Sequence, residues 1–134
     1  MQIEFPFVEE RANIVPRILR PIARVKLTNK NKETTLDMYV DSGADITLIP
    51  YSVGIALGYR LNPEEEIKRI GGIGGGKISI VLRKAKMRIN NEELEIRLAW
   101  CMSEDVPLIL GRMDIFNKFD ILLKEREKKT VFIK

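Results

Sequence analysis

The sequence predicts one all-β domain with the architecture of a small barrel or sandwich. Apolar and polar residues alternate along many short segments, which is the period of half-buried strands. Turn-forming residues separate these segments at regular spacing, as is typical of small barrels and sandwiches. The chain contains no internal repeat, low-complexity tract or linker, so we expect residues 1–134 to fold as a single domain around one core.

The first twenty residues are expected to form an N-terminal strand and an arm. Ile3, Phe5 and Phe7 alternate with polar residues and with Pro6, which indicates a strand. Because proline cannot donate to a strand ladder, this strand should lie at an edge or at an interface. Residues 8–20 are charged and irregular, and their pattern predicts no regular element.

The strands expected in the middle of the chain are mostly recognised by apolar side chains on alternate positions. They comprise residues 22–28, 34–40, 67–70, 77–80, 83–89 and 94–102. Asn29–Lys32 and Asn90–Asn91 are the expected turns. Five glycines around Ile73 join two of the strands into a hairpin with a conformationally permissive tip. Tyr51–Leu57 is expected to form a short helix or turn that ends at Gly58.

The C-terminal part is expected to add three short strands and a helical segment. Leu108–Leu110 is predicted to be a buried strand that ends at Gly111. Met113–Phe119 carries apolar residues at helical spacing, which predicts one or two helical turns. Asp120–Leu123 and Thr130–Ile133 are the last two expected strands, joined by a charged turn.

Composition excludes several classes of protein. The net charge of +4 is spread along the sequence and indicates solubility rather than nucleic-acid binding. No apolar run is long enough to span a bilayer, and the first residues lack the features of a signal peptide. The single cysteine, Cys101, cannot form an internal disulfide, so we expect a cytoplasmic protein. The absence of histidine excludes Ser-His-Asp and Cys-His catalysis and His-ligated metal sites, and we expect neither a metal nor a cofactor.

The stretch Met38–Pro50 places an acid, a hydroxyl and a glycine between apolar β-forming segments. A carboxyl group in such a setting, here Asp41, should lie at the floor of the fold, partly removed from water. There it is a candidate general acid or base. The alternative is a solvated β-turn, because Asp, Ser and Gly all form turns. Asp41–Ala44 resembles the active-site motif of the aspartic proteases, with serine where threonine is commoner.

Three features follow one another in a characteristic order. Asp41–Asp45 comes first, the glycine-rich hairpin Ile70–Ile78 follows, and Leu108–Arg112 precedes the expected helix near the end. In this order they resemble the retropepsin family, the homodimeric aspartic proteases of retroviruses and their cellular relatives. The resemblance extends from about Ile22 to the C-terminus. It implies a small closed β-barrel with one short C-terminal helix and a glycine-rich flap hairpin.

Hydrolysis of a peptide bond by carboxyl groups requires two of them. A deprotonated one activates water, and a protonated one polarises the carbonyl group. The sequence contains a single Asp-Ser-Gly, which begins at Asp41. A two-fold dimer supplies the second carboxyl by symmetry. The expected activity is therefore that of a homodimeric aspartic endopeptidase acting on an extended peptide or an unfolded protein.

The resemblance also implies roles for the neighbours of Asp41. Ser42 would brace the two active-site loops across the dimer axis, and Ala44 and Asp45 would contact the main chain of the substrate. Arg112 would pair with Asp45 and steady the loop, a task that suits an arginine–carboxylate fork. Gly43 would allow a close approach between the backbone and the substrate.

Two further expectations concern the flap and the ends of the chain. Gly72, Ile73 and Gly74 would lie at the tip of a lid that closes over the substrate and excludes water. The terminal strands Ile3–Phe7 and Val131–Ile133 would interleave with those of the partner subunit, as they often do in the family. Residues 1–20 would then contribute to the dimer interface.

Other interpretations remain open for individual segments. A retropepsin-like fold without proteolysis would act as a peptide-binding or assembly module. Gly71 and Gly76-Lys77 have the spacing of a P-loop, but Ile78 occupies the position of the magnesium-binding hydroxyl. A nucleic-acid-binding barrel would use the basic face formed by Lys84, Lys86 and Arg88, although no aromatic residues interleave with them to stack bases. We therefore expect neither nucleic acid nor a membrane as a partner.

Overall fold

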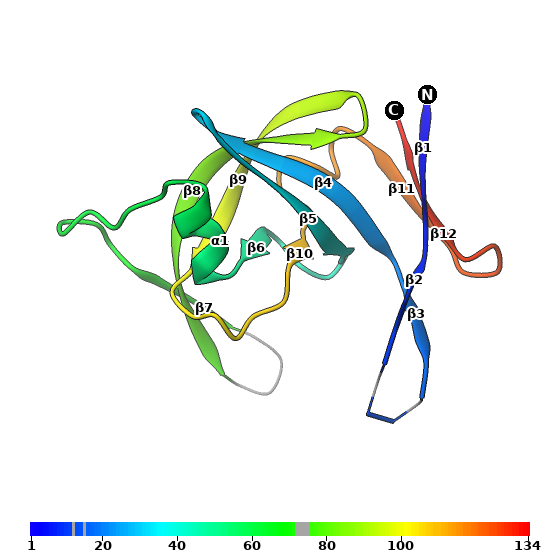
Figure 1. Ribbon diagram of the computed structural model, residues 1–134, viewed down its shortest axis with the longest axis horizontal. Helices are drawn as coiled ribbons and strands as arrows, with labels where there is room; N and C mark the ends of the chain where they lie inside the picture. The colour runs from blue at the N-terminus through cyan, green and yellow to red at the C-terminus, as the bar shows by residue number, and fades with distance from the viewer. Residues whose placement is uncertain (12, 15, 72–75) are drawn as a thin grey trace.

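The computed structural model describes residues 1–11, 13–14, 16–71 and 76–134 (Figure 1). Its described part contains twelve strands and one short helix. The elements are β1 (Gln2–Pro6), β2 (Val8–Glu10), β3 (Ile18–Arg20), β4 (Ile22–Asn29), β5 (Lys32–Val40), β6 (Thr47–Ile49), α1 (Tyr51–Ala56), β7 (Lys68–Gly71), β8 (Lys77–Ile89), β9 (Glu92–Cys101), β10 (Ile109–Leu110), β11 (Asp120–Lys124) and β12 (Lys129–Ile133). The predicted all-β class is confirmed.

Six of the strands close into a barrel. They are hydrogen-bonded in the order β4-β5-β10-β6-β9-β8, and pairing of β8 with β4 completes the ring. Three residue pairs make this closure, from Lys26–Arg88 to Thr28–Lys86. Among the described residues, strand β7 pairs with β8 alone, and so extends the long hairpin beyond the barrel. The closed barrel expected from the sequence is therefore present.

Alternation along β8 and β9 builds much of the core. Met87 and Ile89 on β8 are fully buried, as are Leu98 and Trp100 on β9. Between Lys84 and Arg97 the intervening residues of the β8–β9 hairpin are mostly exposed and charged, whereas Ala99 and Cys101 at the end of β9 are buried as well. The sequence predicts two strands between residues 77 and 89, whereas the structure has one continuous strand of thirteen residues. Continuous pairing with β9 from Ile80 onward explains the difference.

Helix α1 packs its one glycine against the single tryptophan. Gly54 is buried, and a β-carbon at this position would overlap the indole ring of Trp100. The Trp100 Nε1–H donates a hydrogen bond of 3.0 Å to the carbonyl oxygen of Tyr51, whose ring stacks on the indole at 5.4 Å between centroids. These contacts fix the helix to the C-terminal end of β9.

A second, three-stranded sheet contains both ends of the chain. Its order is β1-β12-β11, and β1 pairs with β12 of the same chain from Gln2–Ile133 to Pro6–Lys129. The position of Pro6 on an edge strand confirms the expectation from its missing N–H group. Because β1 is already paired with β12, any interleaving of terminal strands between subunits would have to use the outer edges of this sheet.

Residues 8–10 and 18–20 form two paired strands that the sequence analysis did not predict. Strands β2 and β3 pair from Val8–Arg20 to Glu10–Ile18. Figure 1 shows the β2–β3 hairpin extending away from the barrel. It carries two surface ion pairs, Arg17–Glu9 and Arg20–Glu10, across its strands.

The expected C-terminal helix is replaced by a series of hydrogen-bonded turns. Asp114 adopts a left-handed backbone conformation with φ of 67°, which interrupts a right-handed helix. Its carboxylate accepts hydrogen bonds from the backbone N–H and the guanidinium of Arg97, at 2.8 to 2.9 Å. The hydrogen-bonded guanidinium lowers the pKa of the Asp114 carboxyl. This link stabilises the fold above the ordinary pKa of aspartate and weakens as the pH falls through the lowered value.

No helix among the described residues has the length and apolar character needed to cross a membrane.

Substitution of Gly54 by alanine is expected to destabilise the fold by about 1–3 kcal/mol, because the added methyl group must displace the buried indole. Equilibrium unfolding in urea measures this change. Gly71→Ala is the matched control, since a β-carbon at Gly71 meets no atom of the described residues within 4 Å. Equal stability of the two variants would contradict the packing role assigned to Gly54.

Candidate active site

Two neighbouring strands hold the end of β5, and so position Asp41 just beyond it. The N–H of Val40 donates to the carbonyl oxygen of Pro21 at 2.9 Å, at the start of β4. The N–H of Asp41 donates to the carbonyl oxygen of Leu110 at 3.0 Å, at the end of β10. The backbone of Asp41 is therefore fixed from both sides.

The loop itself is a tight turn closed by the Asp41 carboxylate. Asp41 Oδ1 accepts the N–H of Gly43 at 2.9 Å, and the N–H of Ala44 donates to the Asp41 carbonyl oxygen at 3.2 Å. A β-carbon on Gly43 would lie 3.3 Å from Oδ1, so glycine keeps this approach uncrowded. Asp41 and Ala44 are half-buried, whereas Ser42, Gly43 and Asp45 are exposed. The turn and the acid therefore coexist in one loop, and the Asp41 side chain is accessible from outside.

Strand β10 lies between β5, which precedes this loop, and β6, which follows it. It runs parallel to β5, with Leu110 opposite Val40, and antiparallel to β6, with Ile109 opposite Leu48. A β-carbon on Gly111 would collide with the carbonyl group of Ile46, so only glycine fits at the end of β10. The predicted stop at Gly111 thus has a packing cause.

Thr47 is a supporting residue to which the sequence analysis assigned no role. Its hydroxyl oxygen accepts the N–H of Gly111 at 3.1 Å, and the side chain is completely buried. The sequence did offer a signal for this role, because Thr47 is the one hydroxyl residue in the apolar strand Thr47–Ile49 that follows the motif. The hydrogen bond joins β6 to the end of β10 where backbone pairing stops.

Arg112 contacts the loop, but not in the way expected. Among the described residues it forms no ion pair with Asp45, so that predicted pairing is wrong for the single chain. Instead Arg112 Nη1 donates to the carbonyl oxygen of Ser42 at 3.3 Å, while the guanidinium lies 5.0 Å from the centre of the Phe116 ring. The backbone N–H groups of Arg112 and Met113 donate to the carbonyl oxygens of Ala44 and Asp45, both at 2.9 Å. Backbone hydrogen bonds thus hold the far side of the loop.

The strands of the glycine-rich hairpin are present, and they pair from Lys68–Ile80 to Gly71–Lys77. Gly72, Ile73 and Gly74, the expected substrate-binding residues at its tip, lie outside the described residues.

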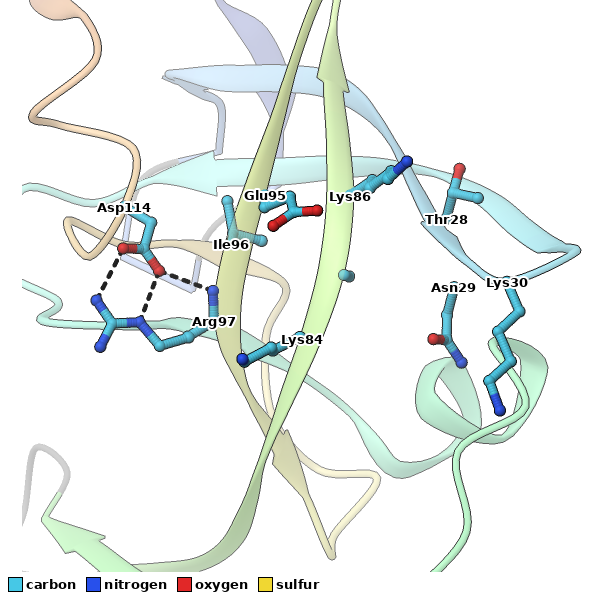
Figure 2. A pocket seen from close by; sticks show the side chains of 10 residues that line it. Thr28, Asn29, Lys30, Lys84, Lys86, Glu95, Ile96, Arg97 and Asp114 are labelled. Carbon is cyan, nitrogen blue, oxygen red and sulfur yellow. Dashed lines mark hydrogen bonds and ion pairs between the residues drawn. The ribbon is translucent and has the colours of Figure 1, made fainter.

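Asp41 does not line the hollow of about 640 Å³ shown in Figure 2, which lies on the outer surface of β8 and β9. Within the described ranges, no three or more Asp, Glu or Cys side chains converge in a way that could hold a metal ion. The chemistry that this site offers is therefore that of an accessible carboxyl group on a rigidly held loop.

Comparisons with known proteins agree with this geometry. A sequence model of the family described as retroviral aspartyl protease matches residues 18–124. The chain therefore belongs to the retroviral aspartyl protease family.

Two solved structures show the same fold. The EIAV protease, solved in complex with the inhibitor HBY-793, is 26% identical, with a TM-score of 0.57 over 74% of this chain and 86% of the viral one. A retropepsin-like aspartic protease from Rickettsia conorii gives a TM-score of 0.66 over 98% of both chains, at 13% identity. No curated protein sequence matches the chain.

Thr47→Val is expected to leave the N–H of Gly111 buried without a partner, and so to lower the free energy of unfolding by about 1–3 kcal/mol. Thr47→Ser keeps the hydroxyl group and should recover most of that loss. Chemical denaturation of both variants compares them directly. If the serine variant is as unstable as the valine variant, packing of the methyl group rather than the hydrogen bond is what matters.

Proposed function

We propose that the protein is an aspartic endopeptidase in which two Asp41 carboxyl groups, one from each subunit of a homodimer, activate the water that attacks the peptide bond. The observation that carries this proposal is the position of Asp41 in a retroviral aspartyl protease fold. It lies on a loop fixed between β4 and β10, with its side chain accessible.

The chemistry requires the second subunit. Two carboxyl groups held close together cannot both ionise readily, so they share a proton and titrate as a pair. The deprotonated member takes a proton from water, and the protonated member donates a hydrogen bond to the scissile carbonyl oxygen. A single Asp-Ser-Gly in the sequence leaves symmetry as the source of the partner carboxyl.

The remaining residues of the loop have supporting roles in this proposal. Ser42 and Gly43 shape the loop at the dimer axis, and Arg112 steadies it through the carbonyl group of Ser42. Ala44 and Asp45 bind the main chain of the substrate. The substrate is an extended peptide or unfolded protein segment, bound as an added β-strand.

The glycine-rich hairpin serves as a lid in this proposal, with Gly72, Ile73 and Gly74 over the bound peptide. A reducing compartment such as the cytoplasm suits the buried, unpaired thiol of Cys101.

Asp41→Asn is expected to preserve the fold and to reduce cleavage by roughly 10²–10⁴-fold, because an amide cannot act as a general base. Digestion of a diverse peptide mixture, read by mass spectrometry from acidic to neutral pH, compares this variant with the wild type. Unchanged cleavage by the variant would refute the role of Asp41. If a verified wild-type dimer cleaves nothing at any pH, the fold serves as a peptide-binding or assembly module instead.

We further propose that the β2–β3 hairpin lies in the dimer interface. An isolated two-stranded hairpin is marginally stable in water. This one exposes Val8 and Leu19, at 45% and 40% of their surface. Its C-terminal end leads directly to Pro21, whose carbonyl group binds Val40 beside Asp41. A partner whose own Asp41 approaches this site would meet the hairpin.

Leu19→Asp is therefore expected to convert the dimer to a monomer and to abolish cleavage, while the barrel stays folded. Light scattering measures the oligomeric state, and circular dichroism the fold. Leu61→Asp is the matched control, because Leu61 is similarly exposed at 45% but lies after α1. A Leu19→Asp variant that remains an active dimer would place the hairpin outside the interface. A wild-type monomer at high concentration would instead refute the shared site.

A further inference from the structure

Two hollows on the outer surface adjoin at the turn between β4 and β5. The first, of about 640 Å³, extends over β8 and β9 (Figure 2). The second, of about 430 Å³, lies between this turn and the end of α1. Both are lined by Asn29 and Lys30, so the turn between β4 and β5 forms part of each hollow.

Basic side chains from four parts of the chain line these two adjoining hollows. We call the set the basic strip; it consists of Lys30, Lys32, Arg60, Lys84, Lys86 and Arg97. Only two carboxylates, Glu95 and Asp114, share the lining. The net charge of the lining is therefore +4, which equals the net charge of the whole chain. The remainder of the surface is electrically balanced, and the excess positive charge is concentrated here.

Most of this charge is uncompensated. Figure 2 shows Asp114 joined to Arg97, so that carboxylate neutralises one cation of the strip. Lys86 lies 3.9 Å from Glu93, at the limit of an ion pair. For the other four cations, no carboxylate among the described residues lies within 4.0 Å. Their charge is available to a ligand.

The basic strip lies far from the candidate active site. Lys32 and Val40 are the two ends of β5, and a strand of nine residues separates them by roughly 26 Å at about 3.3 Å per residue. Asp41 directly follows Val40. A ligand in the strip therefore occupies a region separate from the peptide bound over Asp41.

We propose that the basic strip binds an extended, acidic segment of a protein substrate or partner. Charge complementarity selects an acidic ligand and accelerates its association. Ile55, exposed at 49% beside the second hollow, adds an apolar contact that suits a polypeptide. The described lining offers no exposed aromatic ring on which a nucleobase could stack, because Tyr59 is buried and its hydroxyl donates to the carbonyl oxygen of Lys84.

This binding is independent of peptide hydrolysis, so it stands or falls separately from the proposed function. For a substrate that carries an acidic segment roughly eight or more residues from its cleavage site, enough to span the distance in an extended chain, the strip would raise the effective concentration of that site at Asp41.

The test uses the Asp41→Asn variant of the 134-residue chain, in which cleavage of the probe is expected to be strongly reduced, and a fluorescently labelled glutamate-rich peptide. Fluorescence anisotropy should show binding that weakens as salt is added. The triple substitution Lys30→Glu, Lys32→Glu and Lys84→Glu should weaken binding by about tenfold or more. The control substitutes three cations of the β11–β12 hairpin, Lys124, Arg126 and Lys128, by glutamate and so makes the same change in net charge.

The control variant should bind the glutamate-rich peptide with an affinity within about twofold of that of the Asp41→Asn parent. Equal weakening by both variants would show attraction to net charge alone and would overturn the proposal. So would equal binding of a glutamine-rich peptide of the same length. Tighter binding of a single-stranded oligonucleotide of matched charge would assign the strip to nucleic acid instead. Because each readout is binding, an inactive wild-type enzyme would leave these outcomes interpretable.

Discussion

The close crossing of β10 over the start of β6 is the constraint on which the site depends. Gly111 lies so near the backbone at Ile46 that no side chain fits between them, and its N–H is bound by the buried hydroxyl of Thr47. This crossing places the end of β10 beside the end of β5. One strand thereby fixes the backbone of Asp41 and, through the residues that follow it, the carbonyl groups of Ala44 and Asp45. Hydrogen bonds of the main chain therefore hold Asp41 in place, and its side chain remains accessible for a reaction.

Periodicity predicts the fold well where one face of a strand is buried and the other is wet. Ile96 and Leu98, on either side of the exposed Arg97, follow that rule, and so do Met38 and Val40 on the strand that leads to Asp41. The β2–β3 hairpin escaped prediction because it exposes both faces and buries no side chain completely. A local pattern of hydrophobicity cannot mark a strand whose partner is only another exposed strand.

The candidate site was predictable in its motif and not in its contacts. Asp41, Gly43 and Gly111 can be assigned from residue type and order, since acid and glycine each have few structural alternatives there. The partner of Arg112 cannot, because a long side chain has several acceptors within reach and tertiary structure chooses the carbonyl group of Ser42 over the carboxylate of Asp45. The prediction of a helix over Met113–Phe119 was wrong for a related reason. The hydrogen bonds between Asp114 and Arg97 favour a left-handed backbone conformation at Asp114, although the apolar residues have helical spacing. The sequence likewise spreads its basic residues evenly, and only closure of the barrel gathers them into one strip.

The packing of α1 on β9 gives the protein an internal optical reporter. Trp100 is the single tryptophan of the chain and is fully buried. Its indole is stacked with the ring of Tyr51, and the guanidinium of Arg83 lies 5.5 Å from the ring centre. Indole emission shifts to longer wavelength when water reaches the ring. The fluorescence of this one residue therefore reports on the contact between α1 and β9 without any added label. It distinguishes a loss of that contact from changes in the distant three-stranded sheet that contains both ends of the chain.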